Sequence, residues 1–246
     1  MQPLLIANWK MQLTDAQSAR IADAVRQCRA SGVSVVLCPS FTALPEVARV
    51  IDGADIALGA QDCAFAEHAA LTGEVSPDDL VREGCTYVLI GHSERRHVLG
   101  ESDEVAGKKL CAAARAGLRP VLCVGETAAE REAGLRNAVL ERQCTAALAS
   151  AALDEVIIAY EPVWAIGTGV HAAPDDASEA ADTITALVAK FGIRARILYG
   201  GSVDATNVAD FLRADGITGV LVGTASQSAD DLCALIGVAV AMTEPL

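Results

Sequence analysis

The chain has 246 residues, a length that fits one large α/β domain or two small ones. Hydrophobic residues make up 52% of it, which is enough for a large core and argues against disorder. The formal net charge is −13, and this sign excludes nucleic acid and anionic membrane surfaces as natural partners. An anionic metabolite can bind such a protein only at a local site that offsets the overall field.

The eight cysteines include no C-x-x-C pair, and no histidine stands at zinc-ligand spacing, so we expect no metal site. A chain of this length and core content has no need of disulfides, and we expect all eight to be thiols in a reducing cytoplasm. The N-terminal MQPLLIANWK lacks the basic start and the apolar length of a signal peptide. The longest apolar run, 232–242, is shorter than the roughly 20 residues of a membrane span. These features predict a cytoplasmic protein without membrane contact.

Short apolar runs alternate along the chain with segments of helical spacing. The runs are rich in Val, Ile and Leu and are not interrupted by polar residues, which is typical of strands buried on both faces of a parallel sheet. We predict strands at 4–9, 33–38, 55–60, 86–91, 119–124, 155–160, 196–200 and 219–223.

Helices are predicted between most of these strands, and several have start signals such as Ser76-Pro77 and Pro174-Asp175. Their ranges are 15–30, 41–50, 103–116, 128–150, 175–190, 204–214 and 228–242. This order favours a closed (β/α)8 barrel, an α/β fold with eight parallel strands and outer helices; an open doubly wound sheet is the alternative. No Ser-, Gly- or Pro-rich linker divides the chain, so we expect one domain over residues 1–246.

In such a barrel the functional groups lie at the C-terminal ends of the strands. Asn8-Trp9-Lys10 ends the first predicted strand, His92 follows the fourth, and Glu161 follows the sixth. Each alone has an ordinary structural explanation, but together at one barrel mouth they indicate acid–base chemistry. Glycines in 200–202 and 223–224 end the last two strands and indicate a phosphate site, because glycine lets backbone N–H groups approach an anion closely.

Motifs spread over residues 4–240 resemble the triosephosphate isomerase family, in order and at the family spacing. They are NWK (8–10), GAQD (59–62), LTGEVS (71–76), IGHSERR (90–96), VLCVGE (121–126), AYEPVWAIGTG (159–169), YGGSV (199–203) and LVG (221–223). The resemblance implies a TIM barrel and a homodimer. It also implies an isomerase of glycolysis and gluconeogenesis that interconverts dihydroxyacetone phosphate and D-glyceraldehyde 3-phosphate through an enediolate, without cofactor or metal.

The resemblance also implies roles for single residues. Glu161 is the base that takes the proton next to the carbonyl, and Lys10 supplies a fixed positive charge. His92 is a neutral imidazole that stabilises the developing oxyanion, held neutral by the N–H groups of a helical turn at 93–96. The remaining implied roles are substrate orientation for Asn8, a place beside the lysine for Glu94, phosphate binding for Gly167, Ser202, Gly223 and Thr224, and a dimer contact for Thr72.

The stretch after Glu161 resembles the family's active-site lid. Pro162 and Trp164 correspond to its first hinge and 165–169 to its tip, while Tyr199 and Ser202 resemble the groups that latch it closed. A lid has a physical purpose here, because the enediolate phosphate expels phosphate if water enters the site.

Three departures from the family pattern stand out. Thr224 replaces the usual glycine, and its β-branched side chain resists a positive φ. Val170 stands where the family usually has lysine, and Ala69 and Leu71 replace a glycine and an aromatic residue of the dimer loop. Sequence drift is the plainer explanation, and a paralogous isomerase of a related phosphosugar, such as a tetrulose phosphate, is the alternative.

Two other classes of protein fit the sequence less well than the isomerase. A barrel lyase or aldolase usually needs a Schiff-base lysine deep on a strand or a metal, whereas Lys10 is the only lysine at a predicted strand end. A binding protein without activity would have lost at least one of Lys10, His92 and Glu161, and all three are present.

Overall fold

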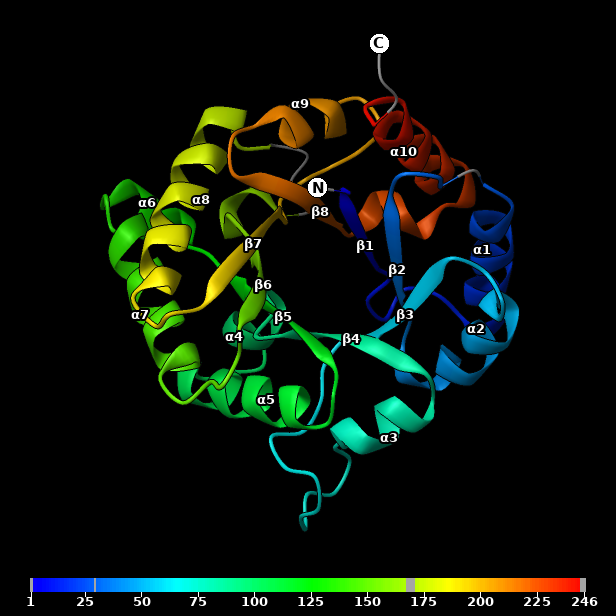
Figure 1. The fold of residues 1–246 in the computed structure, drawn as a ribbon, viewed down its shortest axis with the longest axis horizontal. Coiled ribbons are helices and arrows are strands. Elements are labelled where there is room, and N and C mark those ends of the chain that lie inside the picture. Colours follow the sequence, from blue (N-terminus) through cyan, green and yellow to red (C-terminus); the bar gives the residue numbers. More distant parts are fainter. Residues whose placement is uncertain (1, 29, 167–170, 244–246) are drawn as a thin grey trace.

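The computed structural model describes residues 2–28, 30–166 and 171–243. Within these ranges, eight parallel strands form a closed barrel in which each strand pairs with the next and β8 pairs with β1 (Figure 1). The strands are β1 Leu4–Asn8, β2 Ser34–Cys38, β3 Ile56–Ala60, β4 Cys85–Ile90, β5 Arg119–Val124, β6 Glu155–Tyr160, β7 Arg194–Tyr199 and β8 Ile217–Val222. The predicted barrel is confirmed, and the open-sheet alternative is wrong.

Helices surround the barrel on its outside (Figure 1). The α-helices are α1 Asp15–Gln27, α2 Leu44–Ile51, α3 Pro77–Arg82, α4 Ser93–His97, α5 Asp103–Arg115, α6 Ala128–Glu132, α7 Arg136–Leu148, α8 Pro174–Ala189, α9 Val208–Arg213 and α10 Ala229–Ala241. Three 3₁₀ turns add η1 Phe41–Ala43, η2 Val163–Ala165 and η3 Thr224–Gln227. The start signals function as capping residues: the Ser76 side chain accepts a hydrogen bond from Asp79 N and so begins α3.

Most predicted helices differ from the observed ones by up to three residues at their ends, and two differ more, for local reasons. The segment 128–150 divides into α6 and α7, because Gly134 adopts a φ of +69° and ends the first helix. The segment 204–214 becomes helical only at Val208. Before it, the Asp204 carboxylate accepts from Thr206 N at 2.7 Å and holds a turn instead.

The core has two layers, and this explains the uninterrupted apolar runs. Alternate strand residues point into the barrel, where Ile6, Leu89 and Leu198 belong to one buried cluster. The residues between them, such as Leu5 and Val88, pack outward against the helices in a second cluster. Each strand therefore needs apolar side chains on both faces.

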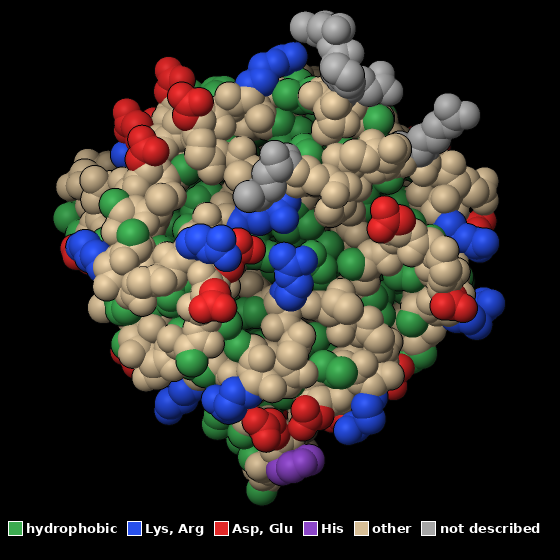
Figure 2. All heavy atoms as spheres, in the orientation of Figure 1, with side chains coloured by type: hydrophobic (Ala, Val, Ile, Leu, Met, Phe, Trp, Pro, Cys, Tyr) green, Lys and Arg blue, Asp and Glu red, His purple; other side chains and the backbone are tan. Residues whose placement is uncertain are grey.

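The connection between β3 and α3 extends beyond the ring of helices (Figure 1). In Figure 2 it forms the lower edge of the molecule, where acidic side chains and a histidine lie beside hydrophobic atoms. Thr72, the predicted dimer contact, is exposed in this segment. No helix of the described part of the chain has the length and apolar character to cross a membrane.

The expectation that every cysteine is a thiol is wrong for one pair. Cys28, directly after α1, and Cys233 in α10 form a disulfide. The two helices pack side by side where the barrel closes, which brings the two Cα atoms to 6.1 Å, within the span of a disulfide. The six free thiols are Cys38, Cys63, Cys85, Cys111, Cys123 and Cys144.

Candidate active site

A cleft of about 540 Å³ lies at the C-terminal ends of the strands. The structure brings seven of the predicted site residues to its walls: Asn8, Lys10, His92, Glu161, Ser202, Gly223 and Thr224. Gly167, predicted to bind phosphate, lies outside the described residues, as does Val170. Four other predicted residues lie behind this lining rather than in it: Glu94, Pro162, Trp164 and Tyr199. Thr72 lies on the projecting segment.

A carboxylate and an imidazole face each other at the centre of the cleft. Glu161 directly follows β6 and is only 1% exposed. One of its oxygens, Oε2, accepts a hydrogen bond from Ser93 N at 2.9 Å. The other, Oε1, lies 3.2 Å from His92 Nε2. The burial removes the carboxylate from bulk water, so it is held by a few protein groups in a defined position.

His92 stands directly in front of α4 and caps this helix with its side chain. Glu94 N donates to His92 Nδ1 at 3.3 Å, so this ring nitrogen acts as an acceptor and carries no proton. The other ring nitrogen, Nε2, faces Glu161. The neutral state of His92 and the effect of the helical turn on it stay predictions.

Lys10 has an unusual backbone conformation, with a φ of +52°. Residues with side chains rarely adopt this left-handed region, so the surrounding contacts must hold it. Asn8 Oδ1 accepts from Lys10 N at 3.1 Å, and Gln61 Nε2 donates to both Lys10 O at 2.7 Å and Cys38 O at 3.0 Å. The Lys10 ammonium then reaches Glu94 Oε1 at 2.6 Å. The strained backbone therefore aims the lysine into the cleft.

A second buried carboxylate, Glu126, anchors the chain after Glu161. Its oxygens accept from Tyr160 OH at 3.1 Å and from Trp164 Nε1 at 2.9 Å, and its carbonyl accepts from Val163 N at 3.0 Å. Burial and this carboxylate raise the pKa of Tyr160, which therefore remains a hydrogen-bond donor. Arg131 lies over the Trp164 ring at 4.0 Å. These contacts fix the chain from Pro162 to Trp164, directly after Glu161.

Ser202 and Tyr199 bind the chain at Ala165 and Ala172, on either side of residues 167–170. Ser202 Oγ donates to Ala165 O at 2.7 Å, before residues 167–170. Tyr199 OH accepts from Ala172 N at 3.0 Å, after them, and its ring stacks on Phe211 at 3.8 Å. Burial raises the pKa of Tyr199 to about 12, so the hydroxyl stays neutral.

Two glycines leave room for the base. A Cβ atom at Gly200 would lie 2.9 Å from Glu161 Cγ, and one at Gly125 would lie 1.7 Å from Glu161 O. Both positions therefore require a residue without a side chain. The sequence did not predict the roles of Gly125, Gly200, Gln61 and Glu126. Their signal was present in the motifs VLCVGE, YGGSV and GAQD, but spacing alone does not show which atoms meet.

The end of β8 closes the cleft beside Lys10. A Cβ atom at Gly223 would lie 3.5 Å from Lys10 Cε. Thr224 follows as the exposed first residue of η3. Among the described residues Lys10 is the only non-glycine with a positive φ, so the β-branched side chain of Thr224 is not strained. The expected conflict at this position does not arise.

A parallel barrel with a buried carboxylate, an imidazole and a lysine at its C-terminal mouth defines a (β/α)8 enzyme of proton-transfer chemistry. The family model for triosephosphate isomerase matches residues 3–239.

Similar proteins carry the same name. A triosephosphate isomerase of Aquifex aeolicus is 41% identical over 96% of this chain and 99% of its own length. Those of Symbiobacterium thermophilum and Geotalea uraniireducens are 45% and 44% identical, each over 96% of this chain and over 96% and 98% of their own lengths. The chain therefore belongs to the triosephosphate isomerase family, and it is an isomerase.

Proposed function

We propose that the protein interconverts dihydroxyacetone phosphate and D-glyceraldehyde 3-phosphate through an enediolate, with Glu161 as the base. The observation that carries this proposal is the 3.2 Å approach of Glu161 Oε1 to His92 Nε2, in a cleft that Lys10 also lines. Membership of the family supplies the reaction and its phosphosugar substrate, and with them a place in glycolysis and gluconeogenesis. The geometry supports the residue roles.

The roles follow from where charge moves in the reaction. Removal of a proton from the carbon next to a carbonyl places negative charge on the carbonyl oxygen. The His92 Nε2–H and the Lys10 ammonium line the same cleft, and donors fixed before the reaction stabilise that charge. Asn8 orients the lysine because its Oδ1 accepts a hydrogen bond from the backbone N–H of Lys10, and Glu94 holds the ammonium in place.

We assign the phosphate group to the wall formed by Ser202, Gly223 and Thr224, with Gly167 as a further predicted donor. The support is that the three described residues line the cleft and that Gly223 lies against the lysine, where an added Cβ atom would be 3.5 Å from Lys10 Cε. We propose Pro162 and Trp164 as the hinge of a lid, because Trp164 is bound to Glu126. Tyr199 and Ser202 are proposed as its latch, because they bind the chain at Ala172 and Ala165.

A coupled assay with matched concentrations of triose and tetrulose phosphates tests the proposal. We expect kcat/KM for the triose phosphate to be higher by about 10²-fold or more, because a pocket built for one substrate discriminates through transition-state contacts. The relatives named above favour the triose substrate over the paralogue alternative. A higher kcat/KM for the tetrulose phosphate would reverse this assignment.

Replacement of Gly200 by alanine should lower kcat about 10- to 100-fold with little change in KM. The new methyl group would lie 2.9 Å from Glu161 Cγ and displace the base by a fraction of an ångström, and such misplacement is costly for a reacting group. Steady-state kinetics of Gly200→Ala check this. Gly237→Ala is the matched control, because no atom lies within 4 Å of its added methyl group. Equal kcat values in both variants would contradict the packing argument.

We also propose a homodimer in which the projecting segment with Thr72 contacts the partner. The support is a set of exposed apolar side chains near the mouth: Met11 is 90% exposed directly after Lys10, and Val98 and Leu99 are 78% and 66% exposed. Sedimentation of Met11→Glu should show a monomer with reduced activity. Leu135→Glu, at an exposed site between α6 and α7, should remain a dimer. A fully active wild-type monomer would refute the dimer.

Two further predictions stand as proposals. We propose that residues 1–246 form a single domain, because β1 and β8 pair with each other to close one barrel. We propose a cytoplasmic location on the basis of the free thiols at six cysteines, which suit a reducing compartment. The other two cysteines, Cys28 and Cys233, form a disulfide and require a separate explanation.

A further inference from the structure

The disulfide lies at the one place in the barrel that the chain does not connect. Each strand from β1 to β7 is joined to its neighbour by a helical connection, whereas β8 and β1 are neighbours in space but not in sequence. Cys28 ends α1, which follows β1, and Cys233 lies in α10, which follows β8. The bond, with a sequence separation of 205, therefore closes the ring of helices covalently.

The inner layer of the same junction is held by backbone pairing. Leu4 pairs with Gly219 and Ala7 with Val222, at the two ends of the ladder between β1 and β8. A Cβ atom at Gly219 would lie 2.0 Å from Leu4 O, so the strands approach as closely as the backbone permits. In the outer layer α1 and α10 lie side by side, and the disulfide joins them covalently.

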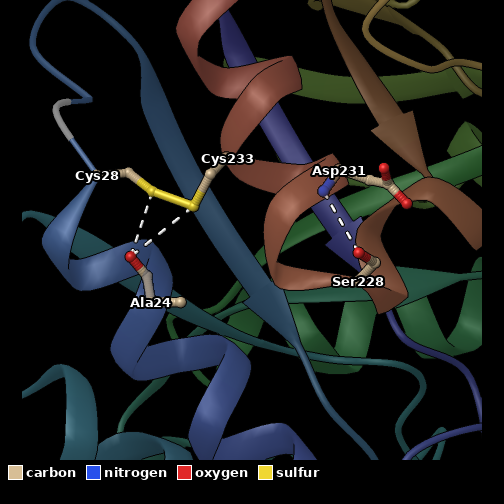
Figure 3. Close-up of a disulfide and its surroundings, with 5 residues drawn as sticks. All are labelled: Ala24, Cys28, Ser228, Asp231 and Cys233. Atoms are coloured by element: carbon tan, nitrogen blue, oxygen red, sulfur yellow. Dashed lines mark hydrogen bonds between the residues drawn. A yellow bond between two sulfur atoms is a disulfide. The ribbon is translucent and has the colours of Figure 1, made fainter.

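The helix that carries Cys233 also borders the active-site cleft. Thr224 and Ala225 in η3 and Asp231 in α10 line this cleft, and Asp231 is two residues before Cys233. Ser228 caps α10 by accepting from Asp231 N at 3.4 Å (Figure 3). A change in the position of α10 at Cys233 therefore acts on the wall of the cleft within less than one helical turn.

The two sulfur atoms lie where reduction is possible. Both cysteines are half-buried, so the bond lies outside the sealed core. The sulfur atoms of Cys28 and Cys233 lie 3.2 Å and 3.8 Å from the carbonyl oxygen of Ala24 (Figure 3). A disulfide has no proton to donate there, but after reduction either thiol can donate to this oxygen. The reduced cysteines thus already lie beside a hydrogen-bond acceptor, the carbonyl oxygen of Ala24.

The remaining thiols are poorly placed to exchange with this bond. Of the six free cysteines only Cys111 is not buried. Burial raises the pKa of Cys63, Cys85 and Cys144 to about 12, so they are not thiolates at neutral pH. The thiolate is the attacking species in exchange, and the pair therefore reacts with external reagents rather than with its neighbours.

We propose that Cys28 and Cys233 form a reducible clamp that positions η3 and the start of α10, and through them the phosphate-binding wall of the cleft. A dithiol reductant breaks the S–S bond, each sulfur gains one hydrogen, and the reductant closes to its own disulfide. In the dithiol form α10 separates more readily from α1, and the Gly223–Thr224 wall is less ordered before the substrate binds. The effect on the cleft rests on the proposed phosphate site.

The test compares the oxidised wild-type enzyme with the same enzyme after treatment with dithiothreitol. Peptide mapping under non-reducing conditions should find the Cys28–Cys233 crosslink. In the reduced enzyme, amide hydrogen exchange should be faster in 224–233, and the inhibition constant of inorganic phosphate should rise about three- to tenfold through loss of preorganisation. The double variant Cys28→Ser/Cys233→Ser should behave like the reduced enzyme with and without dithiothreitol, and Cys111→Ser should respond like the wild type.

The possible outcomes test the disulfide clamp and the proposed phosphate site separately. Absence of the crosslink, or equal exchange of 224–233 in both redox states, overturns the clamp. Faster exchange with an unchanged inhibition constant overturns its coupling to the cleft. Failure of phosphate to compete with the substrate in either redox state contradicts the proposed phosphate site, and the hydrogen-exchange result then still decides whether the clamp exists.

Discussion

Replacement of Glu161 by glutamine is expected to lower kcat by about 10²- to 10⁴-fold, the range that a positioned general base contributes. Glutamine has the same shape, and its amide oxygen can still accept from Ser93 N, as Glu161 Oε2 does at 2.9 Å. What it lacks is the ability to take a proton. KM should change little, because the base makes its main contribution in the transition state.

The matched control for this variant is Glu155→Gln. Glu155 begins the same strand, β6, and is exposed at the end away from the cleft. The same chemical change on the same strand should leave kcat within about twofold of the wild type, since surface substitutions have small effects. Steady-state kinetics and a melting curve for both variants separate catalysis from stability. A kcat within tenfold of the wild type for Glu161→Gln would remove Glu161 as the base.

The strands were predictable because burial on both faces leaves a strong local signal. The run EVIIAY predicted 155–160, and β6 has these bounds. Helix ends were less predictable, because they depend on turns such as the one at Gly134. The spacing of apolar residues does not show such turns. The barrel then follows from the order of the elements, because parallel neighbours joined by helices close in only a few ways.

The candidate site was predictable as a set of residues but not as a set of contacts. Lys10, His92 and Glu161 stand at strand ends, and a barrel brings strand ends together. Which groups support them depends on side-chain geometry across distant parts of the chain. Gln61 reaches the carbonyl of Lys10 over a separation of 51 residues, and no local pattern reports such a contact.

The disulfide was missed for a related reason. The rule that long, core-rich chains lack disulfides describes whether a chain needs them for stability. Whether a disulfide can form depends instead on the distance between two cysteines in the folded chain. Cys28 and Cys233 are 205 residues apart and meet only because the first and last helices pack together when the barrel closes. In the chain-entropy model a loop of this length corresponds to about 5 kcal/mol, so the bond has a large potential effect on stability.

A large effect on stability is also expected at a buried cation, Lys109. Its side chain is 4% exposed, and its ammonium lies 2.7 Å from both Asp62 Oδ2 and Glu101 Oε2. Lys109→Met should lower the free energy of unfolding at pH 8 by about 3–5 kcal/mol, because loss of one partner leaves buried carboxylates without their counter-charge. Arg95, at 3.0 Å and 2.7 Å from the same two carboxylates, compensates only in part.

The pH dependence distinguishes lost charge from lost packing. Burial raises the pKa of Asp62 to about 6 even with Lys109 present, from an ordinary value of 3.8. A carboxyl group with a raised pKa binds more protons in the folded than in the unfolded state between these values, so its contribution to stability falls as the pH rises through that window. Glu101 behaves in the opposite way in the wild type: although burial raises its pKa, hydrogen bonds from Lys109 and Arg95 leave it below the ordinary value.

Removal of Lys109 takes away the interaction that favours both carboxylates, so both pKa values should rise. The deficit of Lys109→Met relative to the wild type should therefore be largest at pH 8 and smaller at pH 5, where Asp62 can be protonated and neutral. Urea unfolding at the two pH values measures it. Lys108→Met is the control, since this neighbouring lysine is exposed and its loss should cost at most about 0.5 kcal/mol. A deficit of equal size at both pH values would mean that packing, rather than the counter-charge, is what Lys109 supplies.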